Sequence, residues 1–186
     1  MNTAVIGPDG VRRCSWCLAN ELYIRYHDEE WGVPENDNQR LFEKMSLESF
    51  QSGLSWLTIL QKRANFRQAF ANFDYRQVAT FNESDIQRLL ADKGIVRHRG
   101  KIEATINNAK CVSLIIQEHG SLAKFFTAFK PYTKTDSTLA TKTTESAALA
   151  KALKQYGWKF FGPTTAYALM QAIGLVNDHA LDCEFK

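Results

Sequence analysis

The stretch from residue 41 to residue 60, LFEKMSLESFQSGLSWLTIL, constrains the fold more than any other part of the sequence. Its apolar residues recur close to helical spacing and fall on more than one face, which predicts a helix inside a domain. They are Leu41, Phe42, Met45, Leu47, Phe50, Leu54, Leu57 and Leu60. Glu48 shares a face with Leu41 and Met45, where an unpaired carboxylate is costly and burial raises its pKa. The simpler alternative is a glutamate at the helix edge that reaches water or an arginine. Gly53 weakens the helix just before Trp56. The carboxylate of Glu48, the small polar groups that follow it and the ring of Trp56 can therefore line a pocket.

Size and composition allow one well-packed domain. The chain has 186 residues, of which 45% are hydrophobic and 12% aromatic; this is enough to bury a core and excludes global disorder. The net charge of +3 permits a nucleic-acid partner without requiring one. No run reaches transmembrane length and the N-terminus lacks the order of a signal peptide, so we expect a cytoplasmic protein with no membrane partner. Four cysteines in such a chain favour thiols or a metal site over disulfides.

The other segments are also helical in pattern, and none alternates with period two, so the predicted fold is all-α. Residues 1–12 are predicted to be an N-terminal extension and residues 13–186 a single domain. Residues 133–144 have few large apolar side chains and are predicted to be a polar surface loop. Expected helices cover residues 56–73, 84–90, 121–129, 147–156 and 163–175, and a longer one follows a turn at residues 94–96.

Cysteine and histidine residues at the two ends of the chain can form a metal site. His179 and Cys183 are four residues apart and would share a face if they lay on a helix. The N-terminal part offers Cys14, Cys17 and His27, and Cys14 and Cys17 alone are a weak signal. Two cysteines and two histidines can close a tetrahedral zinc site that leaves no open position, so such a metal would be structural. The alternative is ordinary buried cysteines and surface histidines.

The segment from Gly94 to Lys101 places a tight turn and a helix N-terminus beside basic side chains. Exposed backbone N–H groups there suit a phosphate. Together with its neighbours in residues 90–102, this segment resembles the helix-hairpin-helix element that grips a DNA backbone without reading sequence. The alternative is a plain helix connection with a solvated charged face.

Aromatic residues gather near Glu48 in the sequence. Such rings usually fill cores, but the N-terminal ones lie among polar residues. Stacking walls and a carboxylate suit a flipped, electron-poor nucleobase. The set is Trp16, Tyr23, Tyr26, Trp31 and Trp56.

These motifs together resemble the 3-methyladenine DNA glycosylase I family of the helix-hairpin-helix glycosylase superfamily. The matching blocks run in order from Arg13 to Cys183, nearly the whole chain. They are Arg13-Cys14-x-Trp16, the block from Leu22 to Pro34, Leu47-Glu48-x-x-Gln51-x-Gly53-Leu54-Ser55-Trp56, the block from Ile95 to Ile102, and Gly174-Leu175-Val176-Asn177-Asp178-His179-x-x-x-Cys183.

The resemblance implies a monofunctional glycosylase that hydrolyses the N-glycosidic bond of 3-methyladenine in double-stranded alkylated DNA. It implies two helical halves whose chain termini are joined by one structural zinc, and we expect a monomer. Glu48 would be the catalytic-site residue and would meet the amino-group edge of the flipped base. The resemblance also implies that the zinc ligands are Cys14, His27, His179 and Cys183. It implies that the rings of Tyr26 and Trp56 contact the base, within a shell formed by Tyr23, Trp16 and Trp31. It further implies that Gly53 and Leu54 form a wedge, and that the DNA phosphates are contacted by Gly94, Arg97, Arg99, Gly100 and Lys101.

Two features depart from the wider superfamily. Val96 replaces the second glycine of the hairpin, and no aspartate lies between Asp92 and Asp136, where a catalytic one is usual. Because N3-methylated adenine is cationic, its glycosidic bond is already weakened and tight binding can supply most of the catalysis. Nothing marks Lys93 or Lys101 as a nucleophile, so we expect no lyase activity.

Two other functions compete with this one. A non-catalytic, zinc-stapled DNA-binding module needs the basic turn and the metal but not Glu48 or Trp56. A hydrolase of the same fold can act on another lesion or on free nucleosides, and competition by free 3-methyladenine would distinguish it. A purely structural metalloprotein leaves the aromatic and basic features unexplained.

Overall fold

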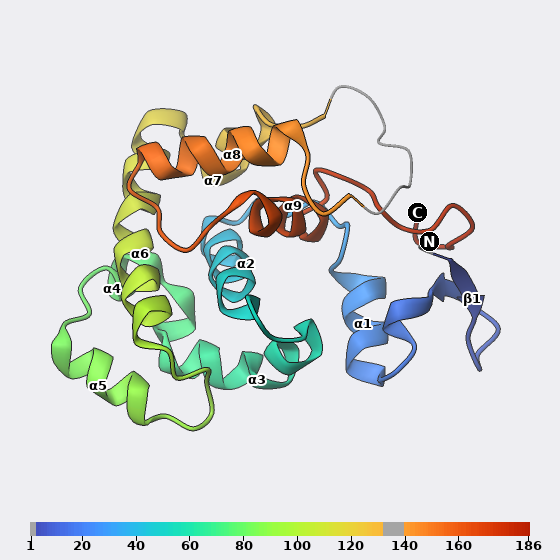
Figure 1. Cartoon of the computed structure of the whole chain (residues 1–186), viewed down its shortest axis with the longest axis horizontal. Coiled ribbons are helices and arrows are strands. Elements are labelled where there is room, and N and C mark those ends of the chain that lie inside the picture. Colours follow the sequence, from blue (N-terminus) through green and yellow to red (C-terminus); the bar gives the residue numbers. More distant parts are fainter. Residues whose placement is uncertain (1–2, 132–139) are drawn as a thin grey trace.

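Helix α2 (Asn38–Gln51) lies at the centre of the molecule, and every residue from 41 to 50 is buried. The computed structural model describes residues 3–131 and 140–186 (Figure 1). Asp37 caps α2 by accepting a hydrogen bond from the backbone N–H of Arg40. The helix packs against α3 (Trp56–Ala69), α6 (Arg99–His119), α7 (Leu122–Thr127) and α9 (Pro163–Ala172). The prediction that this segment lies inside the domain is confirmed.

The apolar stretch of residues 41–60 is divided between α2 and α3, and the second helix ends at Ala69, before the expected residue 73. Gly53 has φ of +85°, a left-handed conformation that breaks the helix. Ser55 then caps α3 by accepting a hydrogen bond from the backbone N–H of Thr58. The connecting turn, residues 52–55, exposes 42% of Leu54.

The remaining helices surround this centre. Side chains of Asn82, Ser121 and Thr143 cap α5 (Glu83–Ala91), α7 and α8 (Thr144–Gln155), close to where helices were expected. Helix α9 begins at Pro163 as expected but ends at Ala172, before the predicted residue 175. No helix was expected at α1 (Glu21–Glu29) or α4 (Tyr75–Val78). The described residues also form two short 3-10 helices, η1 (Ser15–Cys17) and η2 (Ala71–Phe73).

A small antiparallel sheet near the N-terminus departs from the all-α prediction. Strand β1 (Ala4–Ile6) pairs with β2 (Arg12–Cys14), with Ala4 opposite Cys14. Each strand has three residues, too few to show a period of two. Arg12 extends the pairing to the C-terminal segment, because its backbone N–H donates to the Glu184 carboxylate (2.8 Å) and its carbonyl accepts from the N–H of Glu184 (3.0 Å). The two chain termini therefore lie together at one end of the molecule (Figure 1).

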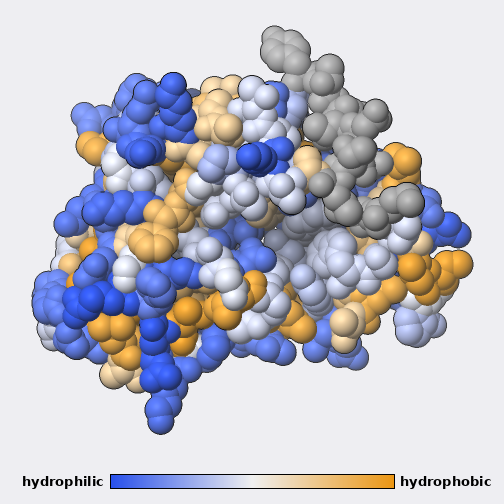
Figure 2. Space-filling model, in the orientation of Figure 1, coloured by the Kyte–Doolittle hydropathy of each residue, from blue (hydrophilic) through white to orange (hydrophobic). Residues whose placement is uncertain are grey.

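The surface and the connecting segments complete the description. Of the predicted polar loop, residues 133–139 lie outside the described residues, and residues 140–143 precede α8 without forming a helix. None of the described helices is long and apolar enough to cross a membrane. Figure 2 shows hydrophobic residues interspersed with hydrophilic ones over the face seen in Figure 1.

Candidate functional site

A cavity of about 150 Å³ opens beside the C-terminal half of α2. Its walls come from five elements that are distant in sequence, and they combine aromatic rings with one carboxylate and two amides. The lining residues are Trp16, Tyr23, Tyr26, Trp31, Glu48, Gln51, Trp56, Ala168 and Gln171. All five aromatic residues singled out in the sequence meet Glu48 here.

Glu48 is buried, with 5% of its surface exposed, and its carboxylate has no hydrogen-bond partner within the described ranges. Burial raises its pKa from 4.5 to about 8, and nearby Lys44 opposes part of that rise. This burial contradicts the alternative of a glutamate at the helix edge, and no arginine pairs with Glu48 within the described ranges. At neutral pH the cavity holds a mainly protonated carboxyl group that a cation can convert into a carboxylate.

Aromatic rings pack around this carboxyl group. The rings of Tyr26 and Trp56 lie 5.4 Å apart, and Trp16 contacts both Tyr23 (4.8 Å) and Trp31 (5.1 Å) edge to face. Burial and then the charge of Glu48 raise the pKa of Tyr26 well above its ordinary value, so its hydroxyl stays protonated. Within the described chain, the buried indole N–H of Trp56 has no hydrogen-bond acceptor, so a ligand or water can provide one.

Lys44 connects the helices that form the walls of the cavity. Its buried ammonium group donates to the carbonyl of Ala172 at 2.9 Å, at the end of α9, and to that of Glu30 at 3.4 Å, after α1. It therefore links α2 to two helices that line the cavity. Lys44 was not among the predicted site residues, although its position four residues before Glu48 places both on one helix face. Ala168 and Gln171 were not predicted either, because no local pattern distinguishes them from other residues of their helix.

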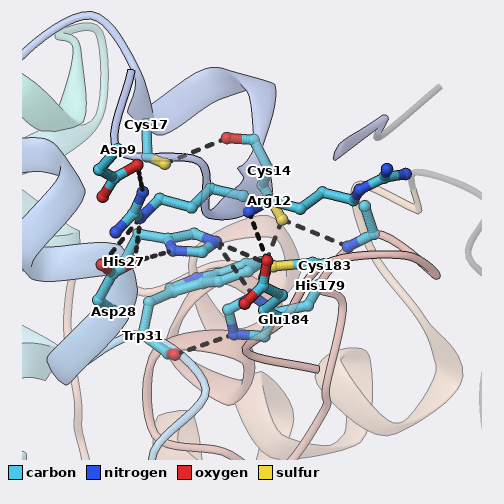
Figure 3. A network of polar contacts seen from close by, with 12 residues as sticks. Asp9, Arg12, Cys14, Cys17, His27, Asp28, Trp31, His179, Cys183 and Glu184 are labelled. Atoms are coloured by element: carbon cyan, nitrogen blue, oxygen red, sulfur yellow. Dashed lines mark hydrogen bonds and ion pairs between the residues drawn. The ribbon is translucent and has the colours of Figure 1, made fainter. Parts of the chain in front are cut away.

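Four buried side chains at the end where the termini meet can hold a metal ion (Figure 3). Donor atoms of Cys14, His27, His179 and Cys183 all lie within 4.8 Å of one another. The closest pairs are His27 Nε2 with His179 Nδ1 (3.2 Å), Cys183 Sγ with His179 Nδ1 (3.5 Å) and Cys183 Sγ with His27 Nε2 (3.6 Å). These are the four predicted ligands. His179 and Cys183 do not share a helix, however, because the segment after α9 is irregular.

Both imidazoles are oriented by a second contact. Nδ1 of His27 lies 2.8 Å from the Asp28 carboxylate, which accepts two hydrogen bonds from Arg13 Nε (2.9 and 2.8 Å). Nε2 of His179 lies 3.2 Å from the carbonyl oxygen of Trp31. Such partners are typical of histidines that bind metals, because they fix the ring orientation and the tautomer.

Cys17 is excluded from this cluster. Its thiol donates to the carbonyl of Cys14 (3.1 Å), and burial raises its pKa to about 12, which opposes the thiolate form that binds metals. The ambiguity between Cys14 and Cys17 is thereby resolved in favour of Cys14.

The expected DNA contacts fall on two connections near the cavity. Gly53 and Leu54 form the exposed turn between α2 and α3, and Gly94 and Arg97 lie in the turn between α5 and α6. Exposed Arg99 at the start of α6 forms salt bridges with Glu83 (2.8 Å) and Glu103 (2.9 Å).

Lys101 is oriented differently from a surface phosphate contact. Its side chain is buried, and Nζ donates to the carbonyls of Phe50 (3.0 Å) and Ser52 (2.7 Å) at the end of α2. Neighbouring Gly100 lies against the ring of Phe160, which a Cβ at residue 100 would approach to 3.2 Å. Lys101 thus joins the start of α6 to the Gly53–Leu54 turn.

A larger groove of about 770 Å³ is lined mostly by charged residues that pair with one another. Arg63 contacts Glu30 (2.7 Å) and Glu43 (2.6 Å), and Arg67 contacts Glu43 (2.9 Å). None of the predicted site residues lines this groove. The smaller cavity has both the unpaired carboxyl group and the aromatic walls, so it is the candidate site.

Comparison with known proteins identifies close relatives. The sequence profile of the methyladenine glycosylase family matches residues 16–186. DNA-3-methyladenine glycosylase 1 of Escherichia coli (strain K12) is 48% identical over 179 residues, 93% of this chain and 96% of the relative. DNA-3-methyladenine glycosylase of Haemophilus influenzae is 44% identical over 180 residues, 94% of this chain and 97% of the relative. The Staphylococcus aureus 3-methyladenine DNA glycosylase I structure that describes 3-methyladenine recognition has a TM-score of 0.87 and 38% identity, and the match covers 94% of this chain and 96% of that one.

Proposed function

The chain belongs to the methyladenine glycosylase family, and we propose that its Glu48 cavity is where that family's reaction takes place. The predicted activity, a DNA glycosylase of base-excision repair that acts on 3-methyladenine, is confirmed by the relatives. The observation that supports the location is the Glu48 carboxyl group, buried in an aromatic cavity and without a hydrogen-bond partner among residues 3–131 and 140–186. A cationic base with an amino group complements both features.

We propose that base recognition combines electrostatics and hydrogen bonding. The rings of Tyr26 and Trp56 attract the positive charge of the N3-methylated base. The same charge favours ionised Glu48, which releases its proton and accepts a hydrogen bond from the amino group of adenine. Trp16, Tyr23 and Trp31 complete the wall and exclude water.

The chemical step needs little from the protein beyond this binding. When the glycosidic bond breaks, its electron pair moves to the base and cancels the positive charge, so the leaving group needs no proton. Water attacks the sugar carbon and gives one of its two protons to solvent, which leaves a hydroxyl at that carbon. Glu48 binds the base and stabilises its positive charge. Its role is recognition of the base more than deprotonation of the attacking water.

We propose that α5, the turn at residues 92–98 and α6 form the helix-hairpin-helix element that holds the DNA backbone. Gly94, Arg97 and Gly100 lie where phosphates can approach the start of α6, and Arg99 must exchange its salt bridges with Glu83 and Glu103 to join them. Gly53 and Leu54 provide the wedge for the gap left by the flipped base. Double-stranded DNA as substrate, a cytoplasmic location and a monomeric state remain predictions.

We propose zinc for the Cys14, His27, His179 and Cys183 cluster. Tetrahedral zinc with bonds of about 2.0 Å to nitrogen and about 2.3 Å to sulfur has ligand–ligand distances of about 3.3–3.8 Å. Four of the six donor pairs, at 3.2, 3.5, 3.6 and 3.8 Å, are close to that range, and all six lie within 4.8 Å. Bound there, the metal would supply no chemistry to the reaction. It would join the N-terminal and C-terminal segments.

Base release from methylated duplex DNA tests the proposal. We expect free 3-methyladenine to appear while 7-methylguanine stays in the DNA and the strand remains uncut. At limiting enzyme, the variants Glu48→Gln and Trp56→Ala should release less base than the wild type because they bind it more weakly, and free 3-methyladenine should inhibit the wild-type chain. Failure of the folded, metal-loaded protein to release any base while it still binds DNA would favour the non-catalytic binding module.

A further inference from the structure

Phe160 is a half-exposed phenylalanine beside the turn that precedes α6. Its side chain is 50% exposed and its ring lies 5.9 Å from that of His98. The ring also covers the backbone of Gly100, where an added Cβ would lie 3.2 Å from Cζ. The edge of an aromatic side chain therefore adjoins the helix N-terminus proposed to receive phosphates.

The backbone of Phe160 is strained. Its φ of +54° is left-handed, a conformation that a bulky residue with a Cβ avoids. Strain of this kind persists only where the surroundings determine the conformation, and it is concentrated at functional sites.

The surroundings of Phe160 fix its position firmly. Buried Asn108 of α6 donates to the carbonyl of Lys159 (3.0 Å) and accepts from the N–H of the same residue (2.8 Å). Asn107 donates to the carbonyl of Gly157 (2.8 Å), and Trp158 is buried in the core. The connection between α8 and α9 (Figure 1) is thus hydrogen-bonded to α6 on the N-terminal side of Phe160, and the side chain of Phe160 remains half-exposed.

Two basic residues are sequence neighbours of the His98–Phe160 ring contact, Arg97 next to His98 and Lys159 next to Phe160. Arg97 and Lys159 are exposed, and within residues 3–131 and 140–186 neither forms a salt bridge. On the other side of the α6 N-terminus, Lys101 holds the end of α2 and with it the Leu54 turn. Phe160 and Leu54 therefore flank one helix end.

We propose that Phe160 contacts the DNA duplex directly, as a second apolar contact in addition to Leu54. The ring packs on a sugar or base edge near the lesion, while Arg97 and Lys159 approach phosphates. A surface with an exposed aromatic ring and unpaired cations suits nucleic acid, which offers π faces and negative charge together. This inference rests on the proposed function and adds a specific residue to its DNA surface.

The test compares Phe160→Gly with the wild-type full chain. Glycine removes the ring and accepts the left-handed backbone, so we expect the melting temperature to stay equal or rise. The probe is a duplex with a tetrahydrofuran abasic site, and we expect its Kd to increase about tenfold. The Kd for free 3-methyladenine should not change, because Phe160 does not line the cavity.

Leu114→Ala is the matched control, because Leu114 is 53% exposed on α6 and should leave duplex binding unchanged. The slope of log Kd against log salt should be the same for Phe160→Gly as for the wild type, whereas Arg97→Gln should reduce it by about one. Wild-type duplex affinity in Phe160→Gly, or a parallel loss of free-base affinity, would overturn the inference. The proposed function would stand in that case as long as the wild-type chain releases 3-methyladenine.

Discussion

Replacing Glu48 with glutamine should stabilise the protein, and by more at high pH than at low pH. Folding raises the pKa of Glu48 from 4.5 to about 8 because of burial. Between these values the folded state keeps a proton that the unfolded state loses, so wild-type stability falls as pH rises from 4.5 to 8. Each pH unit in that window costs about 1.4 kcal/mol. Glutamine does not titrate, so the advantage of the variant should grow by about 4 kcal/mol between pH 5 and pH 8.5.

Urea denaturation of both proteins at pH 5 and pH 8.5 measures this difference directly. Glu43→Gln is the matched control, since Glu43 is on the same helix and equally buried at 5% exposure. Its carboxylate, in contrast, binds Arg63 and Arg67, so glutamine there should destabilise the protein at both pH values.

An advantage of Glu48→Gln that is the same at pH 5 and pH 8.5 would refute the reasoning, because it would mean that Glu48 is ionised in the free protein. Such a result would also remove the proposed proton release on base binding. The same variant, at saturating enzyme, distinguishes recognition from chemistry: weakened base binding with a retained single-turnover rate would support recognition.

Three further changes test the other parts of the site. Cys183→Ala should lose bound zinc and lower the melting temperature, as metal analysis and thermal unfolding would measure; unchanged metal content would exclude the cluster as the site. Lys101→Met leaves two carbonyls at the end of α2 without a donor and should cost about 2–3 kcal/mol in urea denaturation, while the salt dependence of DNA binding changes little. Trp56→Ala should weaken 3-methyladenine binding in calorimetry by at least about fivefold through loss of a cation–π wall, and an unchanged Kd would place the base elsewhere.

Local signals in the sequence predicted most of the helices, because caps and periodicity act over a few residues. Asp37 and Asn82, for example, cap α2 and α5 through hydrogen bonds to backbone N–H groups two or three residues ahead. The metal cluster was predicted from residue types and family motifs. One part of the reasoning was wrong, because His179 and Cys183 were expected to share a helix face, whereas an irregular segment brings them together. The clamp of Asn108 on Lys159 depends on residues 51 positions apart, which no local pattern reveals.

The metal cluster and the cavity share a wall, which explains why both ends of the chain contribute to one site. Trp31 lines the cavity, while its ring lies 4.5 Å from that of His179 and its carbonyl contacts the same imidazole. The segments that carry these residues cross so closely that a Cβ at Gly174 would lie 2.6 Å from the carbonyl oxygen of Gly32. His27, on the same helix as Tyr26, fixes the orientation of α1 from the metal side. Zinc loss should therefore disturb the Trp31 side of the cavity first, and Glu48 and Trp56 on α2 and α3 should keep their positions.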